Sequence, residues 1–419
     1  MTTLTIIQSV KARIIFNSRG EETVEVEVKT LGGSGRASAP AGKSKGKYEV
    51  AYFPPGGVRE AVEKLRSTVE PRLVGLDADN QKLVDETLHE IDGTENFSRL
   101  GGNTAYAVSL ASAQAAASTH GVPLFAQLAG ETSNLRLPLP LGNVLGGGKH
   151  AGKGAPDFQE YLTVAEGCGS FRQAYEANLQ VHRRLGKLLE ERAPGFTRGK
   201  GDEGAWAPRL GNEEALEAVS KAAEEVSGEM GVKVRVGLDV AASSFWDSRS
   251  KVYRYESERR TLGREEHMDH VLRLIQEYRL AYVEDPLEEE DFQGFAELTE
   301  KAKGCLICGD DLFVTSREKL EEGIRLKAAT AVIIKPNQVG TVSDALEAAK
   351  LARGSGLVPI ASHRSGETCE GHLAHLAVAF GCPLIKAGVL GGERVAKMNE
   401  LLRIEENYGR ALPLASLKT

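Results

Sequence analysis

Lys335 ends a run of apolar residues in the segment AVIIKPNQ at 331–338. Val332, Ile333 and Ile334 precede it, and Pro336 follows and ends the segment. Such a run is typical of a strand that is buried on both faces, where an unpaired ammonium group is energetically costly. A lysine in this place is therefore a candidate for chemistry rather than for packing.

Three acidic residues follow other short apolar runs in the same way. Asp239 ends VRVGLD, Glu284 ends AYVE, and Asp310 follows CLICG. Three ionised carboxylates in one low-dielectric cavity repel each other, so a cation must join them if they converge. Oxygen ligands without neighbouring cysteine or histidine ligands favour Mg²⁺. The alternative is a salt bridge from each carboxylate to a nearby loop, which explains one such residue more easily than three.

Lys386 ends a further run, PLIK, and would share the rim with Lys335. Proximity to each other and to a divalent ion disfavours the ammonium form, so we expect both lysine pKa values to fall from about 10.4 toward neutrality. One lysine could then act as a base while the other binds an anion. A base beside a metal ion is suited to removing a proton alpha to a carboxylate, because the metal stabilises the resulting enediolate. The alternative is that each lysine simply extends to a surface carboxylate.

The segment SHRSGET at 362–368 places His363, Arg364 and Ser365 together where another apolar run ends. An arginine beside a hydroxyl and backbone N–H groups suits a phosphate or a carboxylate. On its own this is a weak signal, since many surface Arg-Ser pairs bind nothing.

A β/α barrel would bring these residues together. From Glu284 on, the residues that end the apolar runs recur every 23 to 28 positions, about one strand plus one helix. In such a barrel the reactive groups stand at the C-terminal ends of the strands. An open, doubly wound sheet is the alternative, but it concentrates its site at one switch point.

The first part of the chain has a different pattern. The segment TVEVEVKT at 23–30 alternates valines with charged residues, which predicts a half-exposed strand, and helices are expected near 58–66, 79–91 and 103–119. The segment around 130–143 holds two prolines and resembles a passage between domains. We therefore expect an α+β domain at 1–130 and a barrel domain at 131–419.

The composition excludes several classes of protein. The 419 residues are 41% hydrophobic and carry an interleaved net charge of −7, which argues against a general nucleic-acid or anionic-membrane binder. A membrane span and a secretory leader are not evident, so a cytoplasmic enzyme is expected. The five cysteines form no disulfide pattern, and Cys305 and Cys308 should point to opposite faces of a strand. His372 and His375 lack an evident third zinc ligand, and Gly42-Lys43-Ser44 lacks the first glycine of a P-loop.

Several longer motifs occur in order along nearly the whole chain, and with them the sequence resembles the enolase family. They are SRGEETVEVEV, PAGKSKG, NVLGGGKHAG, DFQEYL, KGDEGAWAP, GLDVAAS, EDPLEEEDF, GDDLFVTS, IIKPNQVGT, SHRSGET and ERVAKMNELLRIEE. The resemblance implies an α+β cap on an eight-stranded barrel of the type ββαα(βα)6, and the Mg²⁺-dependent interconversion of 2-phosphoglycerate and phosphoenolpyruvate. Enolase-superfamily sites are themselves the established example of a lysine or histidine base working with one or two Mg²⁺ ions.

The resemblance also implies roles for individual residues. Lys335 would take the C2 proton, and Glu203 would be the acid that helps the C3 hydroxyl leave. Two Mg²⁺ ions are implied, the second arriving with the substrate and held in part by Ser44. The implied catalytic residues are Lys335, Glu203, Glu160 and His363; the metal ligands are Asp239, Glu284, Asp310 and Ser44; the substrate-binding residues are His150, Gln159, Glu160, Glu284, Asp310, Ser362, His363, Arg364, Ser365 and Lys386.

Most members of the family form dimers and some form octamers, so a homo-oligomer is expected. The chain departs from the usual pattern at AGKSKG, which replaces SGASTG and places Lys43 and Lys45 beside the expected phosphate. The segment after Lys386 is one residue shorter than usual. These differences bear on loop closure and substrate affinity. Two other functions stay open: an enolase-like protein with a binding or structural role, and a related acid-sugar dehydratase or cycloisomerase.

Overall fold

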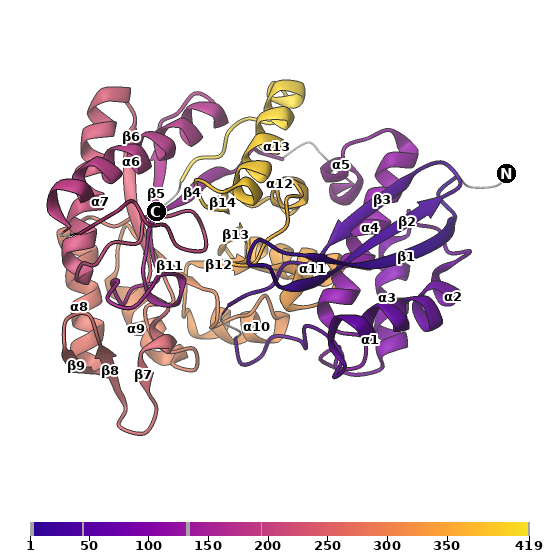
Figure 1. Ribbon diagram of the computed structural model, residues 1–419, viewed down its shortest axis with the longest axis horizontal. Coiled ribbons are helices and arrows are strands. Elements are labelled where there is room, and N and C mark those ends of the chain that lie inside the picture. The colour runs from indigo at the N-terminus through magenta and orange to yellow at the C-terminus, as the bar shows by residue number, and fades with distance from the viewer. Residues whose placement is uncertain (1–3, 44–45, 131–134, 194, 418–419) are drawn as a thin grey trace.

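The structure is a computed structural model that describes residues 4–43, 46–130, 135–193 and 195–417. An antiparallel sheet packed on helices forms one end of the molecule, and a closed barrel ringed by helices forms the other (Figure 1). The sheet contains β1 (Ile7–Phe16), β2 (Glu22–Thr30) and β3 (Ser34–Ser38), and its helices are α1 (Gly57–Lys64), the π-helical turn η1 (Leu65–Val69), α2 (Glu70–Leu73), α3 (Gln81–Asp92), α4 (Gly102–His120) and α5 (Leu124–Ala129). The predicted strand and three helices at 23–119 are therefore confirmed.

The N-terminal core lies between the sheet and the alanine-rich helix α4. Val24, Val26 and Val28 of β2 are fully buried, as their alternation predicts. Small residues allow the helix to approach the sheet closely. A Cβ atom on Gly35 of β3 would lie only 2.2 Å from the carbonyl oxygen of Ala111, so glycine is required at this crossing.

The barrel is closed, and its strands follow the order β10-β11-β12-β13-β14-β4-β5-β6. Its second strand in the chain, β5, runs antiparallel to both neighbours, and all the other pairs are parallel. The topology is therefore ββαα(βα)6, as expected, and the open sheet is excluded. The strands are β4 (Leu139–Gly146), β5 (Glu160–Glu166), β6 (Lys233–Asp239), β10 (Tyr282–Glu284), β11 (Leu306–Gly309), β12 (Ala331–Ile334), β13 (Val358–Ser362) and β14 (Leu384–Lys386).

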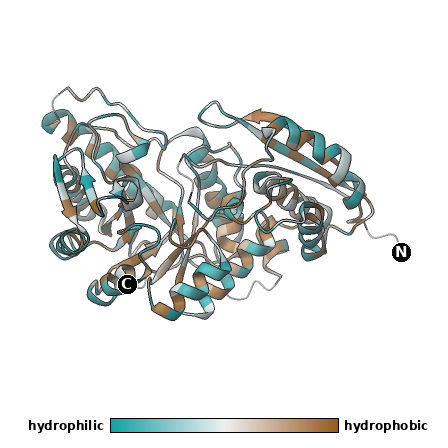
Figure 2. Cartoon of the chain, turned by 90° about the horizontal axis from the view of Figure 1, so that it is seen from below, coloured by the Kyte–Doolittle hydropathy of each residue, from teal (hydrophilic) through white to brown (hydrophobic). Residues whose placement is uncertain are grey.

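Amphipathic helices surround the barrel and show both hydrophilic and hydrophobic residues along their length (Figure 2). They are α6 (Phe171–Arg192), α7 (Asn212–Met230), α8 (Arg264–Glu277), α9 (Phe292–Lys301), α10 (Arg317–Leu326), α11 (Val342–Gly354), α12 (His372–Ala379) and α13 (Gly392–Tyr408). Between β6 and α8 the chain forms a small antiparallel sheet that the sequence pattern did not predict, made of β7 (Trp246–Asp247), β8 (Val252–Tyr255) and β9 (Arg260–Gly263). Short 3-10 turns are η2 (Gly148–His150), η3 (Ala242–Ser244) and η4 (Pro336–Gln338).

Each barrel strand is buried on both faces, as the apolar runs predicted. Ile333 of β12 belongs to the cluster inside the barrel, whereas Val332 and Ile334 belong to the main core, which includes the surrounding helices. Cys308 likewise packs inside the barrel and Cys305 in the main core, so the two thiols do not share a metal site. Within the described ranges, no helix is both long and apolar enough to cross a membrane.

The N-terminal domain reaches the barrel at the C-terminal ends of its strands. Ala41 pairs with Gly366 in an isolated antiparallel bridge, and the Val50 N–H donates to the Gln338 carbonyl oxygen over 3.1 Å. The segment around Ala41 therefore lies over the loops that follow β12 and β13. The domain boundary expected at 130–131 adjoins residues 131–134, which lie outside the described part of the chain, and stays a prediction.

Candidate active site

The reactive residues from the strand ends converge on one cavity at the mouth of the barrel. Asp239, Glu284 and Lys386 are the last residues of β6, β10 and β14, and Lys335 directly follows β12. Glu160 joins them because β5 is antiparallel, so its first residue stands at the same rim and pairs with Asp239. The predicted residues that line the cavity are His150, Gln159, Glu160, Glu203, Asp239, Asp310, Lys335, Ser362, His363, Arg364, Ser365 and Lys386.

Lys386 lies among three carboxylates. Its Nζ is 2.9 Å from Asp239 Oδ2, 2.7 Å from Glu284 Oε2 and 3.2 Å from Glu160 Oε2, and the side chain is 3% exposed. Burial alone would lower the pKa of Lys386, but Asp239, Glu160 and Glu284 outweigh burial and raise it well above its ordinary value. Glu284, which does not itself line the cavity, is thus connected to it through Lys386.

Lys335 forms a close ion pair with Asp310. The turn η4 begins immediately after Lys335, and Thr315 accepts a hydrogen bond from the Lys335 N–H over 2.9 Å. Burial lowers the pKa of Lys335, but Asp310 outweighs burial and raises it to about 12. The protein groups alone therefore raise both lysine pKa values, because each ammonium group contacts carboxylates that favour its charged form. The fall expected beside a divalent ion stays a prediction.

The carboxylates around the lysines fit a hard cation. Glu284 Oε1 is buried and has no hydrogen-bond partner among the described residues. Burial and the nearby Asp239 carboxylate raise the pKa of Glu284 well above its ordinary value. Asp239, Glu284 and Asp310 offer only oxygen atoms, the ligands that Mg²⁺ prefers. Ser44, the expected ligand of a second ion, lies outside the described residues.

A second acidic group adjoins Asp310 and was not anticipated from the sequence. Asp285, Asp310 and Asp311 each place a carboxylate oxygen within 4.8 Å of the others. Asp285 accepts hydrogen bonds from the backbone N–H groups of Asp310 and Asp311, over 2.9 and 2.8 Å. Asp285 therefore holds the turn that presents Asp310; the only signal for this role is its place directly after Glu284.

Glu160 and Glu203 form the other side of the cavity. His150 Nδ1 lies 3.3 Å from Glu160 Oε1 and 3.6 Å from Glu203 Oε1, so this ring nitrogen lies close to both acids. His363 Nε2 is 3.3 Å from Glu203 Oε2, and the Asn143 amide donates to the same oxygen over 3.1 Å. All these side chains are buried.

The environments of the two acids push their pKa values in opposite directions. Burial and the negative charge of Glu203 raise the pKa of Glu160. For Glu203, burial is outweighed by His363 and His150, and its pKa falls well below its ordinary value. Two carboxyl groups whose surroundings push their pKa values apart are suited to separate acid and base roles.

Glycines place Glu203 beside His150. Gly204 has a φ of +76°, and a Cβ atom there would lie 2.2 Å from the Leu390 carbonyl oxygen. A Cβ atom on Gly201 would lie 2.4 Å from the His150 carbonyl oxygen. The glycines of the segment GDEG therefore let it pass close to both neighbouring loops.

Arg364 forms a buried salt bridge with Glu49 of the N-terminal domain. Its Nη1 and Nη2 atoms each lie 3.0 Å from a Glu49 carboxylate oxygen, and Tyr52 and Asn337 also accept hydrogen bonds from it. Ser365 Oγ accepts a hydrogen bond from the Lys43 N–H over 2.7 Å, and Lys43 Nζ lies 3.1 Å from Asp202. Glu49 and Tyr52 escaped the sequence analysis, since nothing in their local sequence marks them.

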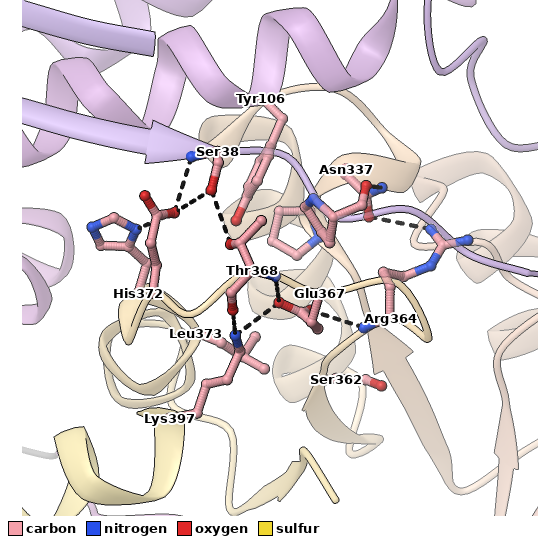
Figure 3. Close-up of a pocket in the computed structure, with 13 residues that line it drawn as sticks. Ser38, Tyr106, Asn337, Ser362, Arg364, Glu367, Thr368, His372, Leu373 and Lys397 are labelled. Atoms are coloured by element: carbon pink, nitrogen blue, oxygen red, sulfur yellow. Dashed lines mark hydrogen bonds and ion pairs between the residues drawn. The ribbon is translucent and has the colours of Figure 1, made fainter. Parts of the chain in front are cut away.

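A buried polar network holds the loop after β13 in place (Figure 3). Glu367 Oε1 accepts a hydrogen bond from the Arg364 N–H over 3.0 Å, and Glu367 Oε2 lies 2.8 Å from Lys397 Nζ. Ser38 of β3 donates to Thr368 over 2.9 Å, which attaches the N-terminal sheet to the same loop. His372 and His375 lie near Glu370 and Glu400, at 3.4 and 3.1 Å, in keeping with structural rather than zinc-binding histidines.

Comparison with known proteins identifies relatives over the whole chain. The family model described as the enolase N-terminal domain matches residues 7–128, and that of the enolase C-terminal TIM barrel domain matches residues 134–418. A protein named enolase from Methanothermobacter thermautotrophicus is 51% identical over 412 residues, which cover 98% of this chain and 99% of that protein. The enolase of Methanosphaera stadtmanae is 50% identical over 402 residues, 96% of this chain and 97% of that protein.

Proposed function

Since the chain belongs to the enolase family and is a phosphopyruvate hydratase, a lyase, we propose which side chains act in the dehydration of 2-phospho-D-glycerate to phosphoenolpyruvate. The observation that carries the proposal is the convergence of Lys335, Lys386, Asp239 and Asp310 from separate strand ends on one cavity, with Glu284 paired to Lys386 beside it.

Asp239, Glu284 and Asp310 are the side chains that would hold Mg²⁺. When bound, the ion supplies positive charge beside the substrate carboxylate, whose negative charge grows as the C2 proton is removed. Ser44 would contribute to a second Mg²⁺ site that forms with the substrate. Lys386 would contact the substrate carboxylate, which can replace one of the protein carboxylates that now surround its ammonium group.

Lys335 is the proposed base at C2. A base must be unprotonated, and Asp310 opposes this by raising the pKa of Lys335 to about 12. Lys335 can lose its proton near neutral pH only when the charge of Asp310 is balanced by another cation. We therefore propose that Asp310 couples metal ligation to the protonation state of Lys335.

Glu160 and Glu203 would stand at the departing C3 hydroxyl. Hydroxide is a poor leaving group, so the reaction needs a proton donor there. Because the pKa of Glu160 is raised and that of Glu203 is lowered, a proton shared by the two carboxyl groups prefers Glu160. The proposed role of Glu203 as the acid then depends on transfer of that proton within the pair.

Arg364 and Ser365 would bind the phosphate, and His150, Gln159, Ser362 and His363 would line the remainder of the closed site. Glu49 fixes the position of the Arg364 guanidinium group, whose permanent positive charge attracts a phosphate.

The test is turnover of 2-phosphoglycerate by the purified protein with Mg²⁺, measured as phosphoenolpyruvate absorbance, with and without a chelator. We expect Mg²⁺-dependent turnover that the Lys335→Ala variant loses. Lys350→Ala is the matched control, because Lys350 lies on the exterior helix α11 and is 51% exposed. Absence of turnover in the native protein would refute the proposal, and turnover of an acid sugar instead would support the related dehydratase.

We further propose that the enzyme works in glycolysis and gluconeogenesis in the cytoplasm and forms a homodimer, with an octamer as the alternative. Light scattering coupled to size-exclusion chromatography distinguishes the two assemblies, and a monomer would contradict both.

A further inference from the structure

Arg394, near the start of α13, is fully buried behind the active site. Its Nη1 lies 2.7 Å from His363 Nδ1 and 2.5 Å from the Arg364 carbonyl oxygen. Its Nη2 donates to the Ser365 carbonyl oxygen over 2.7 Å. One guanidinium group thus contacts three consecutive residues of the loop after β13.

The contact with His363 fixes which ring nitrogen carries the proton. A guanidinium group has five N–H donors and no acceptor, so Nδ1 of His363 must accept. In a neutral imidazole the proton then resides on Nε2. His363 Nε2 lies 3.3 Å from Glu203 Oε2, and within the described part of the chain it has no hydrogen-bond partner of good geometry. The Nε2–H group of His363 therefore lies beside Glu203, on the acidic side of the cavity.

We propose that Arg394 is a positioning residue that holds His363 as the neutral imidazole with its proton on Nε2, and that the same contact orients Arg364 and Ser365. The inference rests on the proposed function of those three residues. It assigns Arg394 a role at both ends of the site, beside Glu203 and beside the proposed phosphate position.

The charges around His363 agree with this state. Arg394, Glu203 and Glu367 are the charged side chains that act most strongly on the ring. Burial lowers the pKa of His363 to about 4 in spite of Glu203, and the positive charge of Arg394 acts in the same direction as burial. His363 is consequently neutral at pH 7, and the position of its single proton becomes the relevant variable.

The backbone at Arg364 is held from both sides. Glu367 accepts the Arg364 N–H over 3.0 Å, a contact drawn in Figure 3, while Arg394 donates to the Arg364 carbonyl oxygen. Buried charged groups thus hold the peptide groups before and after Arg364, so loss of either should displace the Arg364 side chain.

The tautomer is measured by ¹⁵N-¹H correlation spectra of the full-length enzyme labelled at histidine, without substrate. The sequence has nine histidines, so the His363 signals are assigned by their loss in His363→Asn. We expect a neutral ring protonated at Nε2 at pH 7. A proton on Nδ1, or a doubly protonated ring, would overturn the proposal even if the enzyme is active, and the expected tautomer would stand even if no turnover were found.

The variant Arg394→Met should release His363 into a mixture of tautomers and raise the pKa of its ring, because the positive charge of Arg394 is removed while burial remains. It should lower kcat/KM by about 100-fold, because the loop and the ring lose their orientation together. Arg403→Met is the control on the same helix, since Arg403 is 62% exposed and contacts Glu400, and it should change neither signal. An unchanged tautomer in Arg394→Met would refute the role, and the wild-type spectrum decides the question if that variant does not fold.

Discussion

Replacing Glu49 with glutamine tests the buried charge pair that joins the two domains at the active site. Glu49 and Arg364 are 1% and 3% exposed in their side chains and form two hydrogen bonds of 3.0 Å. Burial would lower the pKa of Arg364, but Glu49 outweighs burial and raises it, so the guanidinium group stays charged. Glu49→Gln leaves that charge buried without its counter-ion.

The expected cost follows from the geometry. Breaking a buried ion pair by removing one partner typically costs about 3 to 5 kcal/mol. The glutamine carbonyl can still accept one hydrogen bond, but its NH₂ group faces the N–H donor of Arg364. We therefore expect a loss of about 3 kcal/mol in the free energy of unfolding. Glu290→Gln is the matched control, since Glu290 pairs with Lys47 at 50% and 56% exposure, where solvent screening leaves such a pair little effect on stability.

Urea unfolding with and without inorganic phosphate measures the effect. In Glu49→Gln the uncompensated Arg364 should bind phosphate more tightly than in the wild type, so added phosphate should recover more stability in the variant. Equal stability of Glu49→Gln and the wild type would show that the pair contributes nothing. Equal stabilisation of both proteins by phosphate would refute the placement of Arg364 at the anion site.

Further predictions concern the lysines and the metal. Lys335→Ala should lower exchange of the C2 proton with solvent by about 10² to 10⁴, measured by deuterium incorporation, and exchange at the native rate would assign the base elsewhere. The folded pKa of Lys335 is raised to about 12, so its pair with Asp310 stabilises the fold fully below about pH 10.5, and this stabilisation is lost as the pH rises through 12. In urea titrations, Lys335→Met should no longer show this loss of stability at alkaline pH. Lys386→Met should tighten Mg²⁺ binding at least about tenfold by calorimetry, since an ammonium group a few ångströms from a cation repels it by several kcal/mol even at an effective dielectric constant of about 20; unchanged affinity would place the ion elsewhere. A chelator should abolish turnover and excess Mg²⁺ should restore it, whereas persistent activity would exclude an essential metal.

The barrel and half of its site could be predicted from local sequence. The run AVII before Lys335 and the runs before Asp239 and Glu284 are short, apolar and regularly spaced, and a strand buried on both faces leaves only its ends for polar groups. Glu203 and His150 lie in irregular segments without such a pattern, so only the family resemblance indicated them. The small sheet at Trp246–Gly263 also carried no clear signal.

Local sequence patterns do not predict contacts between residues that are far apart in the chain. Glu49 and Arg364 are 315 positions apart, and Lys386 and Asp239 are 147 apart. Distant carboxylates such as Asp239 raise the lysine pKa values in the protein alone, and the fall expected beside a divalent ion stays a prediction. Arg394 escaped notice for the same reason, since its partners belong to a loop about 30 residues away.

Each cationic side chain of the site pairs with one or more carboxylates in the protein alone. Lys386 is shared by Asp239, Glu284 and Glu160, Lys335 is paired with Asp310, and Arg364 with Glu49. A cation that takes Asp239, Glu284 and Asp310 leaves Lys335 without its partner and Lys386 with Glu160 alone. A phosphorylated carboxylate supplies negative charge that can replace the lost partners. The cation and the substrate thus each offset an electrostatic penalty that binding of the other creates. This compensation gives a physical reason for metal and substrate to bind together, and for a second ion to enter only with the substrate, whose charge exceeds what a single divalent cation can balance.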